Sequence, residues 1–148
     1  DRDVTGVQTC ALPISGVDAQ LRKVVMTMNS ALWAAQLTLA AVFAVSGTAK
    51  LTMPRERLLA TGQTGVAMFP MPVVRFTAAM ELLAAVGLVA PWLTGIGPVL
   101  TPLAAAGLCA VMVGAAWAHT RLREPASVAV NIVLFGLAAF VVVGRLLG

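Results

Sequence analysis

Long apolar runs separated by short polar segments dominate the chain from residue 30 onwards. Each run has about 20 residues, which is the length that a helix needs to cross the hydrocarbon core of a bilayer. The runs predict membrane-spanning helices at about 30–50, 73–93, 99–118 and 127–146. Between the second and third runs, the sequence TGIGP contains helix-breaking residues and predicts a tight turn. The pattern therefore predicts an all-α polytopic membrane protein, folded as an antiparallel bundle of four transmembrane helices.

The connection between the first two spans is longer than the others and reads LTMPRERLLATGQTGVAMFPMP. Pro54 is expected to start a short interfacial helix that ends near Leu59. In that helix, Arg55 and Arg57 would face lipid headgroups, and Leu58 and Leu59 would face lipid. An interfacial or re-entrant cap and a plain linker are equally compatible with this composition.

The first 27 residues differ from the rest and are interpreted as a leader to a membrane domain of residues 28–148. The stretch VTGVQTCALPIS resembles, nearly letter for letter, the translation of a common sequencing-library adapter. Residues 1–15 are therefore expected to be artefactual and disordered, and they are excluded from functional reasoning. Met26, Met28 and an upstream codon remain open as the native start.

Composition and charge agree with a membrane location. The chain is 59% hydrophobic and 11% charged, whereas soluble domains are about 45–50% apolar and about 25% charged. Its net charge of +4 comes from basic residues at the ends of apolar runs, which indicates membrane topology and not nucleic-acid binding. One side carries Lys50, Arg55, Arg57, Arg75, Arg121 and Arg123; the other carries Arg145, with Arg22 and Lys23 in the leader. The positive-inside rule then predicts a multi-pass protein of the bacterial cytoplasmic membrane, with loops 1–2 and 3–4 in the cytoplasm and both termini outside.

The cysteine and histidine content limits the chemistry that this chain can perform alone. Outside the leader there is one cysteine, Cys109, and one histidine, His119. One thiol cannot form an internal disulfide or a redox pair, and one histidine cannot supply two axial ligands to haem. No metal site and no cofactor bound by this chain alone are predicted, and catalytic residues are not identified.

Four polar residues interrupt the apolar runs: Lys50, Glu81, His119 and Asn131. Glu81 lies about eight residues into its span, or roughly 12 Å along the helix axis. A carboxylate at that depth is costly unless it faces the bundle interior and finds a partner. The antiparallel topology places all four residues in the same half of the bundle. They form either a network that fixes helix register, with Glu81 paired to Lys50 or Asn131, or a polar pocket for a headgroup, a quinone or a proton.

Small residues recur every fourth position in the third span, at Ala106, Ala110, Gly114 and Ala118. Such a face allows helices to approach closely in lipid. It predicts either a helix contact within the bundle or a seam between two copies of the chain. Gln36, in the other half of the first span, is expected to bond to a neighbouring helix.

The same segments carry a family resemblance. The sequences FAVSGTAKL, AAMELLAAVGLVAP, AAGLCAVMVGAAWAHTRLRE and NIVLFGLAAFVVVGR contain Lys50, Glu81, His119 and Asn131 in turn, and their order and spacing resemble the DoxX-like membrane proteins over residues 30–147. The resemblance implies a four-helix membrane bundle. The family is named for a subunit associated with thiosulfate:quinone oxidoreductase or quinol oxidase complexes.

This resemblance implies an accessory or anchoring subunit of a quinone-linked membrane redox complex, with an oxidoreductase as its partner. Any electron-transfer cofactor would belong to that partner, and a quinone is the ligand implied for this chain. A small proton-coupled transporter, with Glu81 as the protonation site, and a purely structural membrane protein are the alternatives. A stand-alone enzyme is not expected, and homo-oligomerisation is left open.

Overall fold

A computed structural model describes residues 14–147, which are helical apart from short connections. Four long helices are apolar enough to cross a membrane. They are α1 (Ile14–Thr52), α3 (Met71–Thr94), α4 (Leu100–Arg121) and α5 (Pro125–Leu147). Between α1 and α3 lie a short helix, α2 (Arg55–Ala60), and a 3₁₀ helix, η1 (Thr64–Met68). The all-α four-span fold predicted from the apolar runs is confirmed.

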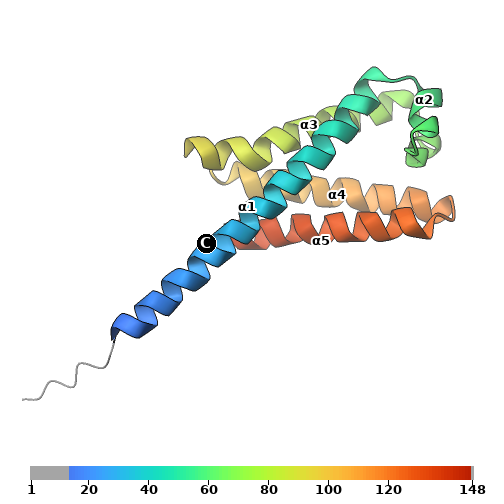
Figure 1. Cartoon of the computed structure of the whole chain (residues 1–148). Helices are drawn as coiled ribbons and strands as arrows, with labels where there is room; N and C mark the ends of the chain where they lie inside the picture. The colour runs from blue at the N-terminus through green and yellow to red at the C-terminus, as the bar shows by residue number, and fades with distance from the viewer. Residues whose placement is uncertain (1–13, 148) are drawn as a thin grey trace, which may run out of the picture.

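The bundle consists of two closely packed helix pairs, α1 with α3 and α4 with α5 (Figure 1). Its centre is filled by apolar side chains from all four long helices, among them Leu39, Leu88, Leu108 and Val141, none of which is more than 1% exposed. The outer surface is also apolar, with residues such as Leu83 largely exposed. Exposed apolar side chains around the whole bundle suit lipid as the surrounding medium.

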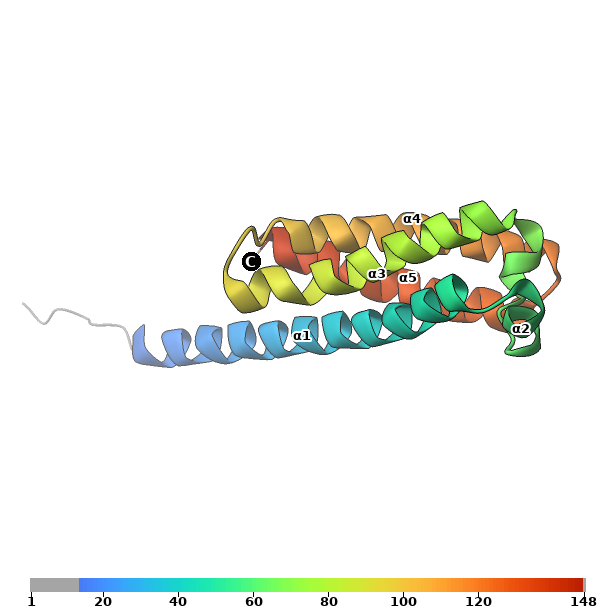
Figure 2. The ribbon, with the colours of Figure 1, turned by 90° about the horizontal axis from the view of Figure 1, so that it is seen from above.

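The two ends of the bundle are built differently. At one end, here called the α2 end, α1 and α4 finish, α3 and α5 begin, and α2 and η1 lie across the helix termini (Figure 2). At the opposite end, α3 turns directly into α4. Gly95 closes α3 with a φ of 70°, and Gly97 follows with a φ of 60°. Glycine adopts these left-handed conformations without steric cost, which explains the tight turn.

Helix α1 begins earlier than the predicted start at residue 30. It has 39 residues, its residues 16–31 are exposed, and its N-terminal part projects beyond the rest of the bundle (Figures 1 and 2). No proline interrupts the chain between Ile14 and Pro54, so the backbone can continue as one helix through the predicted leader. The expected disorder of residues 1–15 concerns a segment that, up to residue 13, lies outside the described residues.

The connection between α1 and α3 is folded onto the bundle as a cap, residues 55–68. Leu58 of α2 is fully buried and packs with Val66 and Val74, and Arg55 Nη2 donates a hydrogen bond of 2.6 Å to the Phe69 carbonyl oxygen. The prediction that Leu58 faces lipid is therefore wrong, whereas Leu59 is exposed. The physical reason is the reversal at Gly62, which has a φ of 87° and folds η1 back beside α2.

Candidate functional site

A cavity of about 600 Å³ lies at the α2 end of the bundle, with walls from all four long helices and from the cap. Most of its lining is apolar, and includes Phe43 and Val74. Three residues of the predicted small-residue face, Ala110, Gly114 and Ala118, border this cavity. Because these side chains are small, α4 leaves space at a place where larger side chains would fill the bundle.

All four polar residues singled out in the sequence line this cavity. Lys50 comes from the end of α1, Glu81 from the first half of α3, His119 from the end of α4 and Asn131 from the start of α5. The antiparallel arrangement thus brings together, at one end of the bundle, residues that are up to 81 positions apart. They do not form one continuous network: Lys50 pairs with Glu81, while His119 and Asn131 bond to other residues.

Lys50 and Glu81 form an ion pair inside the bundle. The Lys50 ammonium nitrogen lies 2.7 Å from Glu81 Oε1, and the two side chains are 19% and 1% exposed. The second carboxylate oxygen, Oε2, is buried and has no hydrogen-bond partner among the described residues. A buried carboxylate with one satisfied oxygen retains the capacity to accept further hydrogen bonds from a ligand.

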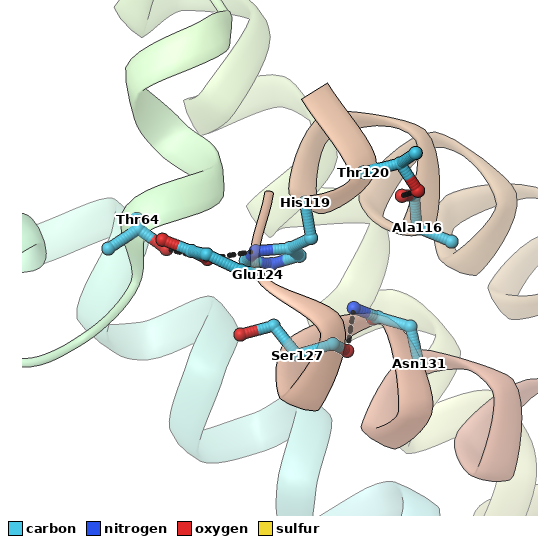
Figure 3. A network of polar contacts seen from close by, with 7 residues as sticks. All are labelled: Thr64, Ala116, His119, Thr120, Glu124, Ser127 and Asn131. Atoms are coloured by element: carbon cyan, nitrogen blue, oxygen red, sulfur yellow. Dashed lines mark hydrogen bonds and ion pairs between the residues drawn. The ribbon is translucent and has the colours of Figure 1, made fainter. Parts of the chain in front are cut away.

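His119 and Asn131 bond elsewhere. His119 Nδ1 lies 2.7 Å from Glu124 Oε2, and the Thr64 hydroxyl donates a hydrogen bond of 2.6 Å to the same oxygen (Figure 3). Asn131 Nδ2 donates to the Ser127 carbonyl oxygen at 2.8 Å, within its own helix (Figure 3). Of the two partners expected for Glu81, the structure therefore shows Lys50 and not Asn131.

Glu124, in the turn between α4 and α5, links this turn to the cap through its hydrogen bond with Thr64. Hydrogen bonds from Thr64 and His119 favour its charged form and hold the pKa of the Glu124 carboxyl below its ordinary value. Next to Thr64, Gly65 packs directly on the imidazole, since a Cβ there would lie 3.1 Å from His119 Nε2. Both residues of this contact line the cavity.

The cap also contributes a polar group that sequence reasoning missed. Gln63 lines the cavity, and its carboxamide oxygen is buried without a hydrogen-bond partner in the described part of the chain. Together with Glu81 Oε2, it gives the α2 end two unpaired buried acceptors. Buried acceptors are costly to leave unpaired, so their presence beside a cavity favours a ligand that carries hydrogen-bond donors.

A second polar cluster lies at the opposite end. Gln36 bonds to two neighbouring helices, as expected: its Nε2 donates to the Leu88 carbonyl oxygen, and its Oε1 accepts from Arg145 Nε and Nη2 at 2.8 and 2.6 Å. Arg145 itself was interpreted from the sequence as a flanking charge, but it is only 9% exposed. This end therefore holds a buried cation that periodicity did not reveal.

Comparison with protein families gives one finding that covers most of the chain. The model of the DoxX-like family matches residues 34–141, a range that includes Lys50, Glu81, His119 and Asn131. No curated protein and no solved structure matches the chain.

Proposed function

Because the chain belongs to the DoxX-like family, we propose that it is a membrane subunit of a quinone-linked redox complex and that the cavity at the α2 end receives the quinone headgroup. On the positive-inside rule, the α2 end faces the cytoplasm of a bacterial cell. The observation that carries the proposal is the buried Glu81 carboxylate, which is paired on one oxygen, unpaired on the other, and borders a cavity.

The residues present fit such a ligand. The cavity is mainly apolar, which suits a ring and the start of a hydrocarbon tail, and its polar groups can fix the orientation of a headgroup. Glu81 and Gln63 would accept hydrogen bonds from ring hydroxyl groups, and Lys50 would donate to ring oxygens. A bound quinone would supply two-electron, two-proton redox chemistry. The chain's own contribution is to bind and orient the ring and to hold a proton acceptor at Glu81 Oε2.

The first experiment tests the cavity. A soluble short-tailed quinol is titrated against the purified protein in lipid nanodiscs, and the rise in Tm is measured. Glu81→Gln removes the charged acceptor and should weaken quinol binding roughly tenfold, the usual effect of losing a hydrogen bond to a charged group. Glu56→Gln, on the exposed side of α2, is the matched control and should bind normally. Equal quinol binding by the two variants would contradict the proposed site.

The second experiment tests the role as a subunit. With one histidine and one cysteine beyond the leader, the chain cannot supply bis-histidine haem ligation or a thiol pair, and the proposal assigns the electron-transfer groups to a partner. Mild solubilisation of native membranes followed by affinity purification should recover an oxidoreductase in fixed proportion. Recovery of the protein alone, from membranes where it is made at its natural level, would contradict the subunit assignment while leaving the quinol test intact.

A proton-coupled transporter is the second candidate, and the buried Glu81 is the observation that favours it. Between Glu81 and the Gln36–Arg145 cluster, however, lies the apolar layer that contains Leu39 and Leu88. The polar side chains described beside this layer, Thr101 and Cys109, bond to backbone carbonyl oxygens of Gly87 and Phe135. No ionisable carboxylate or imidazole is described within the layer, which favours a binding site over a transport path. Proton flux into liposomes that falls in Glu81→Gln but not in Glu56→Gln would reverse that preference.

A further inference from the structure

The opposite end of the bundle buries a positive charge without an acidic partner in the described chain. Arg145 is 9% exposed, and no Asp or Glu side chain among residues 14–147 pairs with it. Its hydrogen-bond acceptors are neutral: the Gln36 carboxamide oxygen takes two bonds, and the Asn29 carboxamide oxygen takes one at 2.9 Å from Nη1. A guanidinium has five N–H donors, so these three bonds leave two donors free, and none of them brings a negative charge to the cation.

Two tryptophan rings and the position of Arg145 near the end of α5 indicate how deep the guanidinium lies in the membrane. The guanidinium carbon is 4.0 Å from the centroid of the Trp92 ring and 5.6 Å from that of Trp33. Trp side chains gather at the boundary between hydrocarbon and headgroups. Arg145 is two residues from the end of α5, or about 3 Å along the axis, which together with the two tryptophans indicates a position near the lipid headgroups.

Asn29 is exposed and bonds to Nη1, so this edge of the guanidinium is the one that a headgroup can approach. We propose that Arg145 and Asn29 bind the phosphate of an anionic membrane lipid at this end of the bundle. The lipid supplies the negative charge that the described chain does not provide, and the Asn29 carboxamide N–H can donate a further hydrogen bond to the same phosphate. The site is independent of the quinone cavity at the α2 end.

The alternative is a purely structural role, in which Arg145 joins α1 and α5 through Gln36. This role explains the bonds to Gln36 but predicts no dependence of stability on the charge of the lipid. The variant Asn29→Asp distinguishes the lipid-binding role from the purely structural one. This substitution keeps the shape of the side chain and places a carboxylate 2.9 Å from Nη1, so the chain then neutralises its own cation.

The test uses the full chain in nanodiscs of either phosphatidylglycerol, which is anionic, or phosphatidylcholine, which is zwitterionic. The natural sequence should have a higher Tm in phosphatidylglycerol. Asn29→Asp should raise the Tm in phosphatidylcholine and lose most of the increase given by phosphatidylglycerol, with roughly tenfold weaker retention of this lipid in native mass spectrometry. An unchanged response of Asn29→Asp to phosphatidylglycerol would overturn the proposal.

Arg121→Gln is the matched control, because Arg121 also lies over a tryptophan, 5.4 Å from the Trp117 ring centroid, but is exposed. It should keep the full response to phosphatidylglycerol, and loss of the response in this variant would reduce the effect to general surface charge and overturn the proposal. Inorganic phosphate added to phosphatidylcholine nanodiscs separates the two sources of the anion. An equal rise in Tm with inorganic phosphate would overturn the assignment to lipid in favour of a free anion.

Discussion

At the α2 end, a buried cation and a buried carboxylate face each other beside a cavity, whereas at the opposite end a buried cation lies among neutral groups in close packing. Lys50 pairs with Glu81 at 2.7 Å, next to the small residues of α4. Arg145 bonds to Gln36 and stacks on Trp92. The two ends therefore use their polar residues differently. The α2 end keeps two unpaired acceptors beside a cavity, whereas at the opposite end Gln36 and Arg145 join helices and the Trp92 indole nitrogen is buried without a partner among the described residues.

The largest effect is expected from removing one member of the ion pair. Lys50→Met leaves the Glu81 carboxylate charged and without its partner in a buried position, which should lower the free energy of unfolding by about 3 kcal/mol. The double variant Lys50→Met/Glu81→Gln removes the stranded charge and should recover part of this loss. Unfolding in mixed micelles measures both values. A double variant less stable than Lys50→Met would contradict the assignment of a buried ion pair.

A smaller loss is expected at the opposite end. Arg145→Met leaves a neutral carboxamide oxygen of Gln36 without its donor and removes the contact with Trp92, for a loss of about 2 kcal/mol. The comparison between the two ends predicts that this loss is smaller than that of Lys50→Met in the same zwitterionic micelles. A loss of stability in Arg145→Met that equals or exceeds the loss in Lys50→Met would contradict the proposed difference between the two ends.

Packing density gives a third test of the difference. A Cβ at Gly144 would clash with the Leu32 side chain, whereas a Cβ at Gly114, on the cavity wall, meets nothing within 4 Å. Gly144→Ala should therefore cost about 1 kcal/mol through overpacking. Gly114→Ala should instead stabilise the protein by about 0.5 kcal/mol, since alanine favours the helix more than glycine does. Thermal unfolding of the two variants distinguishes them, and a similar cost at both glycines would contradict the difference in packing.

The smallest effect on stability is expected from the contacts of Glu124 that hold the cap against the α4–α5 turn. Because the pKa of Glu124 is lower in the folded protein than its ordinary value of 4.5, its contribution to stability is present above pH 4.5 and is lost as the pH falls through the folded value. The difference in Tm between the natural sequence and Glu124→Gln should therefore shrink as the pH is lowered from 6 to below 4.5. A difference that stays constant over this range would exclude the Thr64–Glu124–His119 contacts as a source of stability.

The spans were predictable because their signal is local: about 20 apolar residues between polar connections specify a helix in lipid. The predicted ends of the four spans lie within three residues of the observed ones, except at the start of α1. Placing Lys50, Glu81, His119 and Asn131 at one end followed from antiparallel topology alone. Their bonding partners did not follow, because partners depend on rotamers and on loop geometry. Asn131, for example, satisfies its amide within α5 and not on Glu81.

Gln63 and Arg145 show two further limits of sequence reasoning. Gln63 lies in a connection without periodicity, so nothing in its neighbourhood indicated that Gly62 would turn it towards the bundle. Arg145 lies near a helix end, where basic residues usually reach the membrane surface. Its burial arises from Gln36 and Trp92, which are over 50 residues away in sequence, and such a contact becomes visible only in the folded bundle.

The most direct test of the account fills the cavity without touching its polar groups. Ala110 lines the cavity, whereas Ala106, one turn earlier on α4, does not, although both alanines are exposed. Titration of a short-tailed quinol against Ala110→Phe and Ala106→Phe in nanodiscs, followed by the rise in Tm, compares the two positions. The account predicts that Ala110→Phe loses the rise while Ala106→Phe keeps it; a rise of the same size in both variants would contradict it.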